Sequence, residues 1–363
     1  MPLNLVVQTA FLGDLLLSIP LLKKCREMWP EHQLGLVCRK GFGDFFLKTG
    51  LVHHVFEIEK GKADTYQKIA ENLKSFEVDH LISPHESLRT AFLVSKIKAR
   101  QKISFAKPWN FIFYNSRVEK DLKLPDPIRQ ISLLKNINPH VTKDIETFRT
   151  QEKPYLPDAH GKLSAPPVWA SMSLRSQVLS LPGVYDSLKA RFPLPGFDEG
   201  KAVLLFPGSV WATKRWTAEG FINAGIALQE KGYQVYVMGG PGEEVLAESV
   251  AKEIPGSICL AGKTKVIEST QLIARAALVI GNDSASTHLA AVCETPLIAV
   301  FGPTIIEFGF RPWSAESYIV HQAGLKCRPC GKHGHHHCPI GTHVCMKNIS
   351  AEEVLKTAGF ILR

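Results

Sequence analysis

The sequence predicts an α/β protein built from two doubly wound domains, each with a parallel sheet. Three observations support this prediction: short apolar runs alternate with helical patterns, the alternation occurs twice, and a proline-rich stretch lies between the two series. The length of 363 residues also suits two domains better than one. Because doubly wound folds bind ligands at the carboxyl ends of their strands, we expect a ligand cleft between the two domains.

The first series of strands and helices fills the N-terminal part of the chain. The expected strands are 3–8, 33–38, 52–58, 78–83 and 100–105. The expected helices are 13–28, 64–76 and 86–98. Such alternation places helices on both faces of a parallel sheet.

A second series begins near residue 201. The expected strands are 201–206, 233–238, 257–261, 277–281 and 296–301. The expected helices are 217–231, 243–253, 268–276 and 285–293, followed by a short last helix from about Ser350. Thr217 is a favourable N-cap and Gly232 a favourable C-cap for the first of these helices.

Seven prolines lie between residues 151 and 200, and they mark the expected domain junction. We expect one short helix inside this stretch. The expected organisation is a first domain over 1–165, a junction over 166–200, a second domain over 201–345 and a C-terminal helix over 346–363.

The net charge of +9 is concentrated in one segment. Between Arg89 and Lys135 there are eleven Lys and Arg residues against three Asp and Glu residues. Such a segment indicates an anionic partner, for instance a phosphorylated ligand, an acidic lipid surface or nucleic acid, or it is simply a solvated basic face. No apolar run has the length of a membrane span and no signal-peptide pattern is present, so we expect a cytosolic protein.

One charged residue interrupts an apolar run near the start. In "VVQTAFLGDLLLSIP", residues 6–20, Asp14 follows Gly13 and is the only charge. We expect a strand to about Gln8, a turn, and a helix that begins near Gly13. Asp14 then lies in the first turn of the helix, where the helix dipole favours its ionised form. It serves there either as a functional carboxylate or merely as a complement to the dipole.

Two of the strand-end turns in the second half carry groups suited to a nucleotide. In "FPGSVWATKRW", residues 206–216, Ser209 and Thr213 offer hydroxyls, and Lys214 precedes a helix start that favours an anion. In "MGGPGEEV", residues 238–245, Gly240 permits close backbone approach and Glu243 can bind a ribose diol. The alternatives are a surface cation at Lys214 and helix-charge compensation at Glu243.

Two further turns add to this cluster. "ALVIGNDSASTHLAA", residues 277–291, places Asp283, Ser284 and His288 at a helix start that suits a diphosphate. A purely structural N-cap with a core histidine is the alternative there. "VFGPT", residues 300–304, is the fourth turn. The chain lacks both the G-x-G-x-x-G pattern after its first strand and the Walker lysine pattern.

These motifs, in this order, resemble those of a known enzyme family. "FLGDLLLSIPLL", "PGSVWATKRW", "GNDSASTHLAA" followed by "VFGPT", and "CRPC…C…CM" resemble glycosyltransferase family 9, the bacterial lipopolysaccharide heptosyltransferases. The resemblance implies a GT-B fold, in which two Rossmann-like domains face each other across a cleft. It implies an N-terminal acceptor domain, a C-terminal nucleotide-sugar domain, and inverting, metal-independent transfer of heptose from ADP-heptose to the lipopolysaccharide inner core.

The resemblance also implies roles for individual residues. Asp14 corresponds to the general base, and Lys214 corresponds to a second catalytic residue that contacts the diphosphate. The implied donor contacts are Ser209, Thr213, Lys214, Gly240, Glu243, Thr264, Asp283, Ser284, Ala285 and His288. The expected acceptor contacts are Gly13 and Arg129, and no residue is expected to hold a metal for the chemistry. Ala285 departs from the family, which commonly has glycine there, and alanine resists a positive φ.

Four cysteines and five histidines cluster near the C-terminus. The cysteines are Cys327, Cys330, Cys338 and Cys345, and the C-x2-C spacing is typical of structural zinc sites. The resemblance explains these cysteines without a metal, so a zinc ion is an alternative that metal analysis of untagged protein would decide. Disulfides are disfavoured in a cytosol.

The expected partners are an ADP-sugar and the anionic core of lipopolysaccharide, reached by peripheral contact with the cytoplasmic face of the inner membrane, with no nucleic acid. One alternative keeps the fold and changes the nucleotide sugar or the envelope glycan acceptor. Another is a zinc-ribbon protein that binds nucleic acid through the basic segment. The sequence leaves open which heptose is moved, which position receives it, and the oligomeric state.

Overall fold

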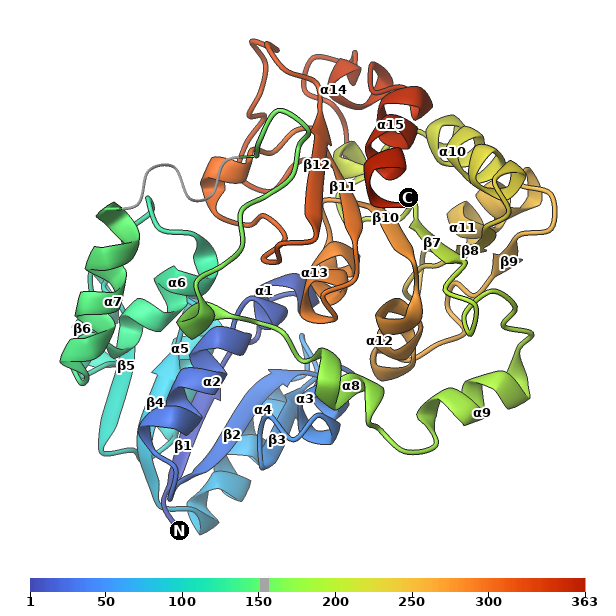
Figure 1. Ribbon diagram of the computed structural model, residues 1–363. Coiled ribbons are helices and arrows are strands. Elements are labelled where there is room, and N and C mark those ends of the chain that lie inside the picture. Colours follow the sequence, from blue (N-terminus) through green and yellow to red (C-terminus); the bar gives the residue numbers. More distant parts are fainter. Residues whose placement is uncertain (151–156, 363) are drawn as a thin grey trace. The chain divides into compact units, whose positions relative to one another are not determined.

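A computed structural model describes residues 1–150 and 157–362. The chain divides into two units. Of the described residues, 1–150 and 167–172 form one unit, and 157–166 and 173–362 form the other. Each unit contains one six-stranded sheet, and all strand pairs in both sheets are parallel (Figure 1).

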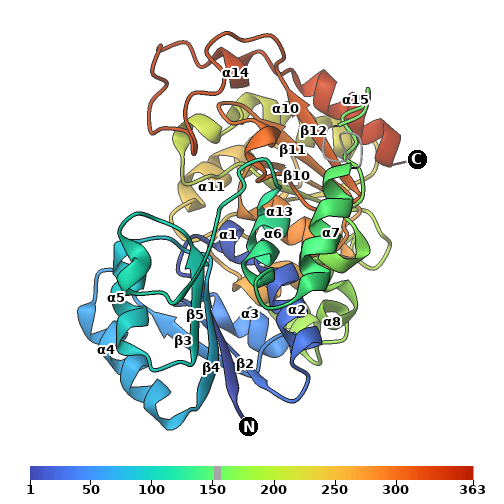
Figure 2. The same ribbon diagram turned by 90° about the vertical axis from the view of Figure 1, so that its left-hand side faces the viewer.

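The sheet of the first unit has the strand order β3-β2-β1-β4-β5-β6. Its strands are β1 (Leu3–Val7), β2 (Gln33–Arg39), β3 (His54–Ile58), β4 (Val78–Ser83), β5 (Gln101–Phe105) and β6 (Ser116–Val118). Its helices are α1 (Leu12–Leu16), α2 (Ile19–Met28), α3 (Gly43–Lys48), α4 (Ala63–Asn72), α5 (Leu88–Lys96), α6 (Asp126–Ile131) and α7 (Pro139–Thr150). Figure 2 shows α4 and α5 on one face of this sheet and α2 and α6 on the other.

The sheet of the second unit has the order β12-β11-β10-β7-β8-β9. Its strands are β7 (Ala202–Phe206), β8 (Gln234–Val237), β9 (Ile258–Cys259), β10 (Leu278–Asn282), β11 (Leu297–Phe301) and β12 (Ser317–His321). Its helices are α8 (Arg175–Leu179), α9 (Val184–Arg191), α10 (Ala218–Glu230), α11 (Glu244–Lys252), α12 (Val266–Arg275), α13 (Ala285–Val292), α14 (Val344–Lys347) and α15 (Ala351–Ile361).

Both sheets have the Rossmann strand order, in which successive strands are added first to one side of the first strand and then, from the fourth strand on, to its other side. This switch point lies between β1 and β4 in the first unit and between β7 and β10 in the second. Doubly wound sheets bind ligands in the crevice at the carboxyl ends of the strands that flank this point. The topology therefore marks one candidate ligand site in each unit.

The expected helix over 13–28 is in fact two helices, α1 and α2. Pro20 lies in the first turn of α2, where its missing N–H and fixed φ are tolerated. In a continuous helix the same proline would remove a hydrogen bond to residue 16 and break the helix. The break makes α1 a short separate element, with Asp14 in its first turn.

The residues of the expected junction, 166–200, are divided between the two units. Residues 167–172 belong to the first unit, and residues 173–200 belong to the second. The second part contains two helices, α8 and α9, where we expected one, and both pack on α12. Upstream, the Leu163 amide donates to the carbonyl of Ser317, the first residue of β12.

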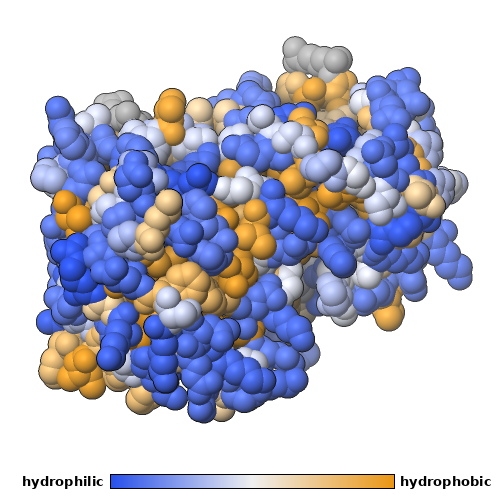
Figure 3. Space-filling view, turned by 90° about the horizontal axis from the view of Figure 1, so that it is seen from below, coloured by the Kyte–Doolittle hydropathy of each residue, from blue (hydrophilic) through white to orange (hydrophobic). Residues whose placement is uncertain are grey.

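No helix in the described residues is long and apolar enough to cross a membrane. The face in Figure 3 is largely hydrophilic, with hydrophobic residues in groups between the polar ones.

Candidate active site

Three of the predicted turns, those after β7, β10 and β11, meet beside the switch point of the second unit. The turn after β7 contains Ser209 and Lys214, and the turn after the neighbouring strand β10 contains Asp283. Lys214 Nζ lies 2.5 Å from Asp283 Oδ2, and Thr304 Oγ1 donates to the same oxygen at 2.6 Å. Three strand-end turns therefore converge on one carboxylate.

Asn282, the last residue of β10, holds the turn after β7 in place. This fully buried side chain accepts a hydrogen bond from the Trp216 amide at 2.7 Å through Oδ1. Its Nδ2 donates to the carbonyls of Pro207 (2.9 Å) and Gly208 (3.2 Å). Asn282 was not among the expected site residues. A polar residue at the last position of a buried strand was the signal for it, because a buried amide requires partners.

Helix α13 begins beside the ion pair. Ser284 is its N-cap residue without a side-chain cap bond, and the first turn contains no acidic residue. Its N-terminal amides and the partial positive charge of the dipole therefore favour an anion at this end. Ala285 is the first helical residue and does not have a positive φ, so the turn does not require the glycine common in the family.

His288 lies one turn into α13 and is almost fully buried. Burial lowers its pKa to about 4, although Asp283 opposes this effect, so the imidazole is neutral near pH 7. Its Nδ1 has no hydrogen-bond partner among the described residues. The side chain thus offers a neutral ring with an unused polar atom beside Asp283 and Lys214.

Glu243 connects the turns after β8 and β7. Its carboxylate accepts a hydrogen bond from the Gly240 amide at 2.9 Å. A Cβ atom at Gly208 would overlap this carboxylate, which shows that Glu243 lies directly against the turn after β7. Glu243 is only half-buried. A carboxylate in this position can accept hydrogen bonds from a pair of vicinal hydroxyls.

The remaining expected donor residues lie in the same unit with different surroundings. Ser209 is buried, and its carbonyl accepts from Arg215 Nε at 2.9 Å. Thr213 Oγ1 exchanges hydrogen bonds with the His335 backbone at 2.9 and 2.7 Å, so it anchors the histidine-rich segment instead of facing solvent. Thr264 follows β9, and its hydroxyl bonds to Ser269 at 2.7 Å.

The switch point of the first unit carries Asp14 and a group of cations. Asp14 is half-buried in the first turn of α1, directly after Gly13. Its charge attracts Arg39, the last residue of β2. Arg39 Nε donates to the Thr9 carbonyl at 2.8 Å, and its guanidinium lies 4.4 Å from the centre of the Phe11 ring. These contacts fix a cation beside Asp14.

Five cations of the first unit lie at or after strand ends or, in the case of Arg89, in the first turn of α5. We call them the basic cluster: Arg39, Lys60, Arg89, Lys107 and Lys120. Arg39, burial and Arg89 together lower the pKa of Lys60. Burial, with Arg39 and Lys60, lowers the pKa of His85 to about 4. Glu86 pairs with Lys107 at 3.1 Å and with Lys120, so the cluster retains an excess of positive charge. An anionic ligand would be favoured here.

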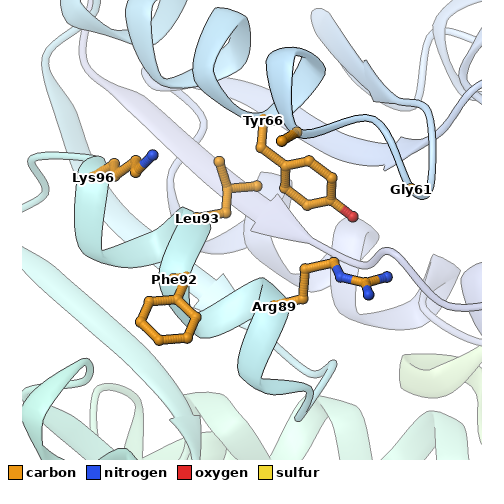
Figure 4. Close-up of a pocket in the computed structure, with 7 residues that line it drawn as sticks. Gly61, Tyr66, Arg89, Phe92, Leu93 and Lys96 are labelled. Atoms are coloured by element: carbon orange, nitrogen blue, oxygen red, sulfur yellow. The ribbon is translucent and has the colours of Figure 1, made fainter.

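A pocket of about 230 Å³ adjoins the basic cluster. It lies between α4 and α5, where Tyr66 and Leu93 face each other (Figure 4). Arg89 and Lys96 lie at its two ends, and Phe92 is largely exposed beside them. The pocket combines an apolar wall with two cations.

We expected Arg129 to contact the acceptor, and the structure places this residue in the interior of the first unit. The side chain is only 2% exposed. Its guanidinium pairs with Asp126 at 3.1 Å and donates to the carbonyls of Asp121 (3.2 Å) and Leu124 (2.6 Å). Arg129 therefore holds the segment before α6 in place, and its guanidinium is occupied by contacts within the unit.

Comparison with known proteins identifies the family. The model of glycosyltransferase family 9 (heptosyltransferase) matches residues 66–339. The chain belongs to glycosyltransferase family 9. It is therefore a glycosyltransferase, and its two Rossmann-like units form the GT-B fold that the sequence predicted. Membership of this family argues against the alternative that the chain is a zinc-ribbon protein that binds nucleic acid.

Relatives of this family 9 chain match over most of its length. Lipopolysaccharide heptosyltransferase 3 of Escherichia coli strain K12 is 26% identical over 330 residues, which cover 86% of this chain and 85% of the relative. The solved structure of E. coli ADP-heptose lipopolysaccharide heptosyltransferase II has a TM-score of 0.77 at 18% identity, covering 100% and 98% of the two chains. E. coli heptosyltransferase WaaC with ADP-2-deoxy-2-fluoro heptose has a TM-score of 0.70 at 17% identity, covering 99% of each chain.

The four C-terminal cysteines of this family 9 chain are free thiols. The Cys330 thiol donates to the Cys327 carbonyl, at 2.9 Å. Although burial opposes it, backbone N–H groups such as that of His343 lower the pKa of Cys338. Within the described residues, these thiols do not form a group of three ligand atoms that all lie within 4.8 Å of one another. A zinc ion at these cysteines stays the less favoured alternative.

Proposed function

We propose that this enzyme transfers heptose from ADP-heptose to the inner core of lipopolysaccharide, with inversion and without a metal ion in the reaction. The convergence of Lys214, Asp283 and the α13 N-terminus at the switch point of the second unit is the observation that carries the proposal. Family membership and the relatives named for this activity support the choice of donor and acceptor.

The second unit is the proposed donor site. The diphosphate would lie at the α13 N-terminus, where Ser284 and the free amides donate hydrogen bonds and Lys214 supplies a cation. Glu243 would accept the two ribose hydroxyls. Asp283 orients Lys214, and the neutral His288 ring faces the same end of the helix. Gly240 and Thr264 would flank the nucleoside.

The departing diphosphate gains negative charge as the glycosidic bond breaks. Positive groups already positioned at that place lower the barrier because they need no rearrangement during the reaction. Lys214 and the α13 amides are such groups. They supply the charge compensation that the proposed metal-independent reaction requires.

Asp14 is the proposed general base. The acceptor hydroxyl attacks the anomeric carbon on the face opposite the leaving ADP, and its proton passes to a carboxylate within hydrogen-bond reach. Asp14 is half-buried at the switch point of the first unit, beside the cation of Arg39. Because the base and the donor contacts belong to different units, the proposed reaction needs both units.

The basic cluster is the proposed acceptor site, in place of the Arg129 contact that we expected. Its cations suit the carboxylates and phosphates of an inner core. Large apolar side chains nearby along the chain are exposed, namely Leu88, Phe92, Phe111 and Ile112. Exposed apolar groups between cations favour an anionic lipid surface, and they support peripheral contact with the cytoplasmic face of the inner membrane.

Two assays test the proposal. Purified enzyme should transfer heptose from ADP-heptose to truncated lipopolysaccharides of defined structure, and the product should have the inverted anomeric configuration. ADP should raise the melting temperature, whereas UDP and GDP at the same concentration should not. Stabilisation by UDP or GDP with no stabilisation by ADP would favour a different nucleotide sugar.

A further inference from the structure

Four potential metal-ligand atoms meet at the amino-terminal ends of the central strands of the first sheet. Asp14 follows the opposite, carboxyl end of β1. Asn4 lies on β1, His32 directly precedes β2, and Asp79 and His80 lie on β4. Because β1 lies between β2 and β4, these three strands bring the side chains together. Among the described residues, His32, Asp79 and His80 are the group whose ligand atoms all lie within 4.8 Å of one another.

The separations of these atoms match those around a small metal ion. His80 Nδ1 lies 3.0 Å from Asp79 Oδ2 and 3.1 Å from Asn4 Oδ1. His32 Nδ1 lies 3.3 Å from Asn4 Oδ1 and 3.9 Å from Asp79 Oδ2. Ligands about 2.0–2.1 Å from a tetrahedral zinc ion are about 3.3–3.4 Å apart. These four separations, 3.0–3.9 Å, therefore lie near the value for a zinc ion.

The surroundings hold these ligands in place. His80 and Asn4 are buried, and the Trp29 ring stacks on the His80 imidazole with ring centres 4.4 Å apart. Arg100 Nη2 donates to Asp79 Oδ2 at 3.2 Å, and Arg100 Nε pairs with Oδ1 of the same carboxylate. Hydrogen bonds to a ligand carboxylate fix its orientation and are typical of metal sites.

We propose that Asn4, His32, Asp79 and His80 form a structural zinc site in the first unit, separate from the transfer reaction. Imidazole nitrogens and a carboxylate oxygen are ligands that zinc accepts in tetrahedral geometry, and the amide oxygen of Asn4 would take the fourth position. The ion would link β1, β2 and β4 at their amino-terminal ends. The proposed acceptor site lies at the carboxyl ends of the strands. Its ligand chemistry also differs from that of the four cysteines in the second unit.

Arg100 is the competitor of the ion. Its Nη2 lies 3.4 Å from His80 Nε2, an arrangement that favours the tautomer with the proton on Nδ1. Zinc on Nδ1 requires the other tautomer, so Arg100 must move away from His80. Its side chain is 71% exposed, so Nη2 can leave the ring while Nε stays paired with Asp79 Oδ1.

Metal binding to the untagged full-length protein tests the site. After removal of bound metal, one equivalent of Zn²⁺ should bind at this site, and His32→Gln should weaken that binding by about 100-fold or more. His54→Gln is the matched control, because His54 bonds to Gln33 on the same sheet but is not a ligand. His32 is only half-buried, so its substitution is less disruptive than that of His80.

Cobalt spectroscopy separates this site from the cysteines. Co²⁺ bound by nitrogen and oxygen should show tetrahedral visible bands without the near-ultraviolet charge-transfer bands of cobalt thiolates. His32→Gln and His80→Gln should each remove these visible bands. Binding that is unchanged in both variants, or cobalt spectra with thiolate bands alone, would overturn the proposal.

Discussion

The ammonium group of Lys214 lies 2.5 Å from Oδ2 of Asp283, and both side chains are largely buried, with 13% and 6% exposed. The pair joins the turns that follow β7 and β10, the two strands flanking the switch point. Thr304 donates to the same carboxylate oxygen. A lysine held so firmly beside the α13 N-terminus is in place before any anion arrives, and this preorganisation underlies the predictions for the donor site.

Lys214→Ala should weaken ADP binding by about 10–100-fold, because a hydrogen bond from a charged group contributes about 1.5–3 kcal/mol. Heptose transfer should fall at least as much. Calorimetric titration with ADP measures the first effect, and Lys231→Ala is the control because Lys231 is an exposed cation at the end of α10. Unchanged affinity and turnover would refute the role of Lys214.

Asp14→Asn should lower the transfer rate by about 10²–10⁴-fold, the usual contribution of a general base. The affinity for ADP should stay unchanged, because the proposed donor contacts all lie in the second unit. The control is Asp44→Asn, which removes a carboxylate from α3 of the same unit. Near-normal turnover by Asp14→Asn would exclude this carboxylate as the base.

Gly208→Ala should displace the Glu243 carboxylate, because the added Cβ would overlap it. If Glu243 binds the ribose, ADP affinity should fall several-fold in Gly208→Ala and to a similar extent in Glu243→Gln. Gly359→Ala is the control, since a Cβ there would have no atom within 4 Å. The ribose contact would be disproved if both donor-site variants bound ADP like the wild type.

The buried His288 should make stability depend on pH. Its pKa is about 4 in the folded protein and about 6.5 in the unfolded chain, so between these values the unfolded chain binds more protons. Stability due to the neutral ring is therefore present above pH 6.5 and lost as the pH falls toward 4. From pH 7 to pH 5 this loss amounts to about 2 kcal/mol.

Urea unfolding at the two pH values measures this effect, and His288→Gln should lose about 2 kcal/mol less than the wild type between them. Other histidines titrate equally in both proteins, so the difference isolates His288. Equal pH dependence in the two proteins would show that the ring is not held neutral by burial.

Arg89→Glu should raise the KM for the acceptor several-fold and leave ADP affinity unchanged. Arg89 belongs to the basic cluster and is exposed at the edge of the pocket between α4 and α5. The effect should diminish at high ionic strength, because salt screens exposed charges. Lys74→Glu is the control with the same change of charge on the same unit. An equal effect of both variants would indicate a general charge effect instead of a site.

Much of the donor site could be predicted because its residues are local in sequence. Turns such as "GNDSASTH" combine a strand end and a helix start within a few residues, and a helix start determines where an anion binds. All ten expected strands are present. Asp14 lies in the first turn of a helix, as expected from the glycine and the apolar run around it.

The remaining features depend on contacts between distant residues. Arg129 lies in a basic segment, but its burial against the carbonyls of residues 121–124 follows from the packing of α6. Arg39 and Lys60 lie in the basic cluster because β2 and β3 are neighbours in the sheet. No local sequence pattern reveals this strand order. The Thr213 hydroxyl bonds to the backbone of His335, which lies more than a hundred positions away in the sequence.

The transfer assay with ADP-heptose tests the central claim most directly. Wild-type enzyme and Asp14→Asn are each incubated with labelled ADP-heptose and heptose-deficient lipopolysaccharide of defined structure, and the product is analysed by mass spectrometry. We predict the addition of one heptose by the wild type and almost none by Asp14→Asn, although both bind ADP equally. Failure of the wild type to add heptose to any inner-core acceptor, or equal addition by the variant, would contradict the claim.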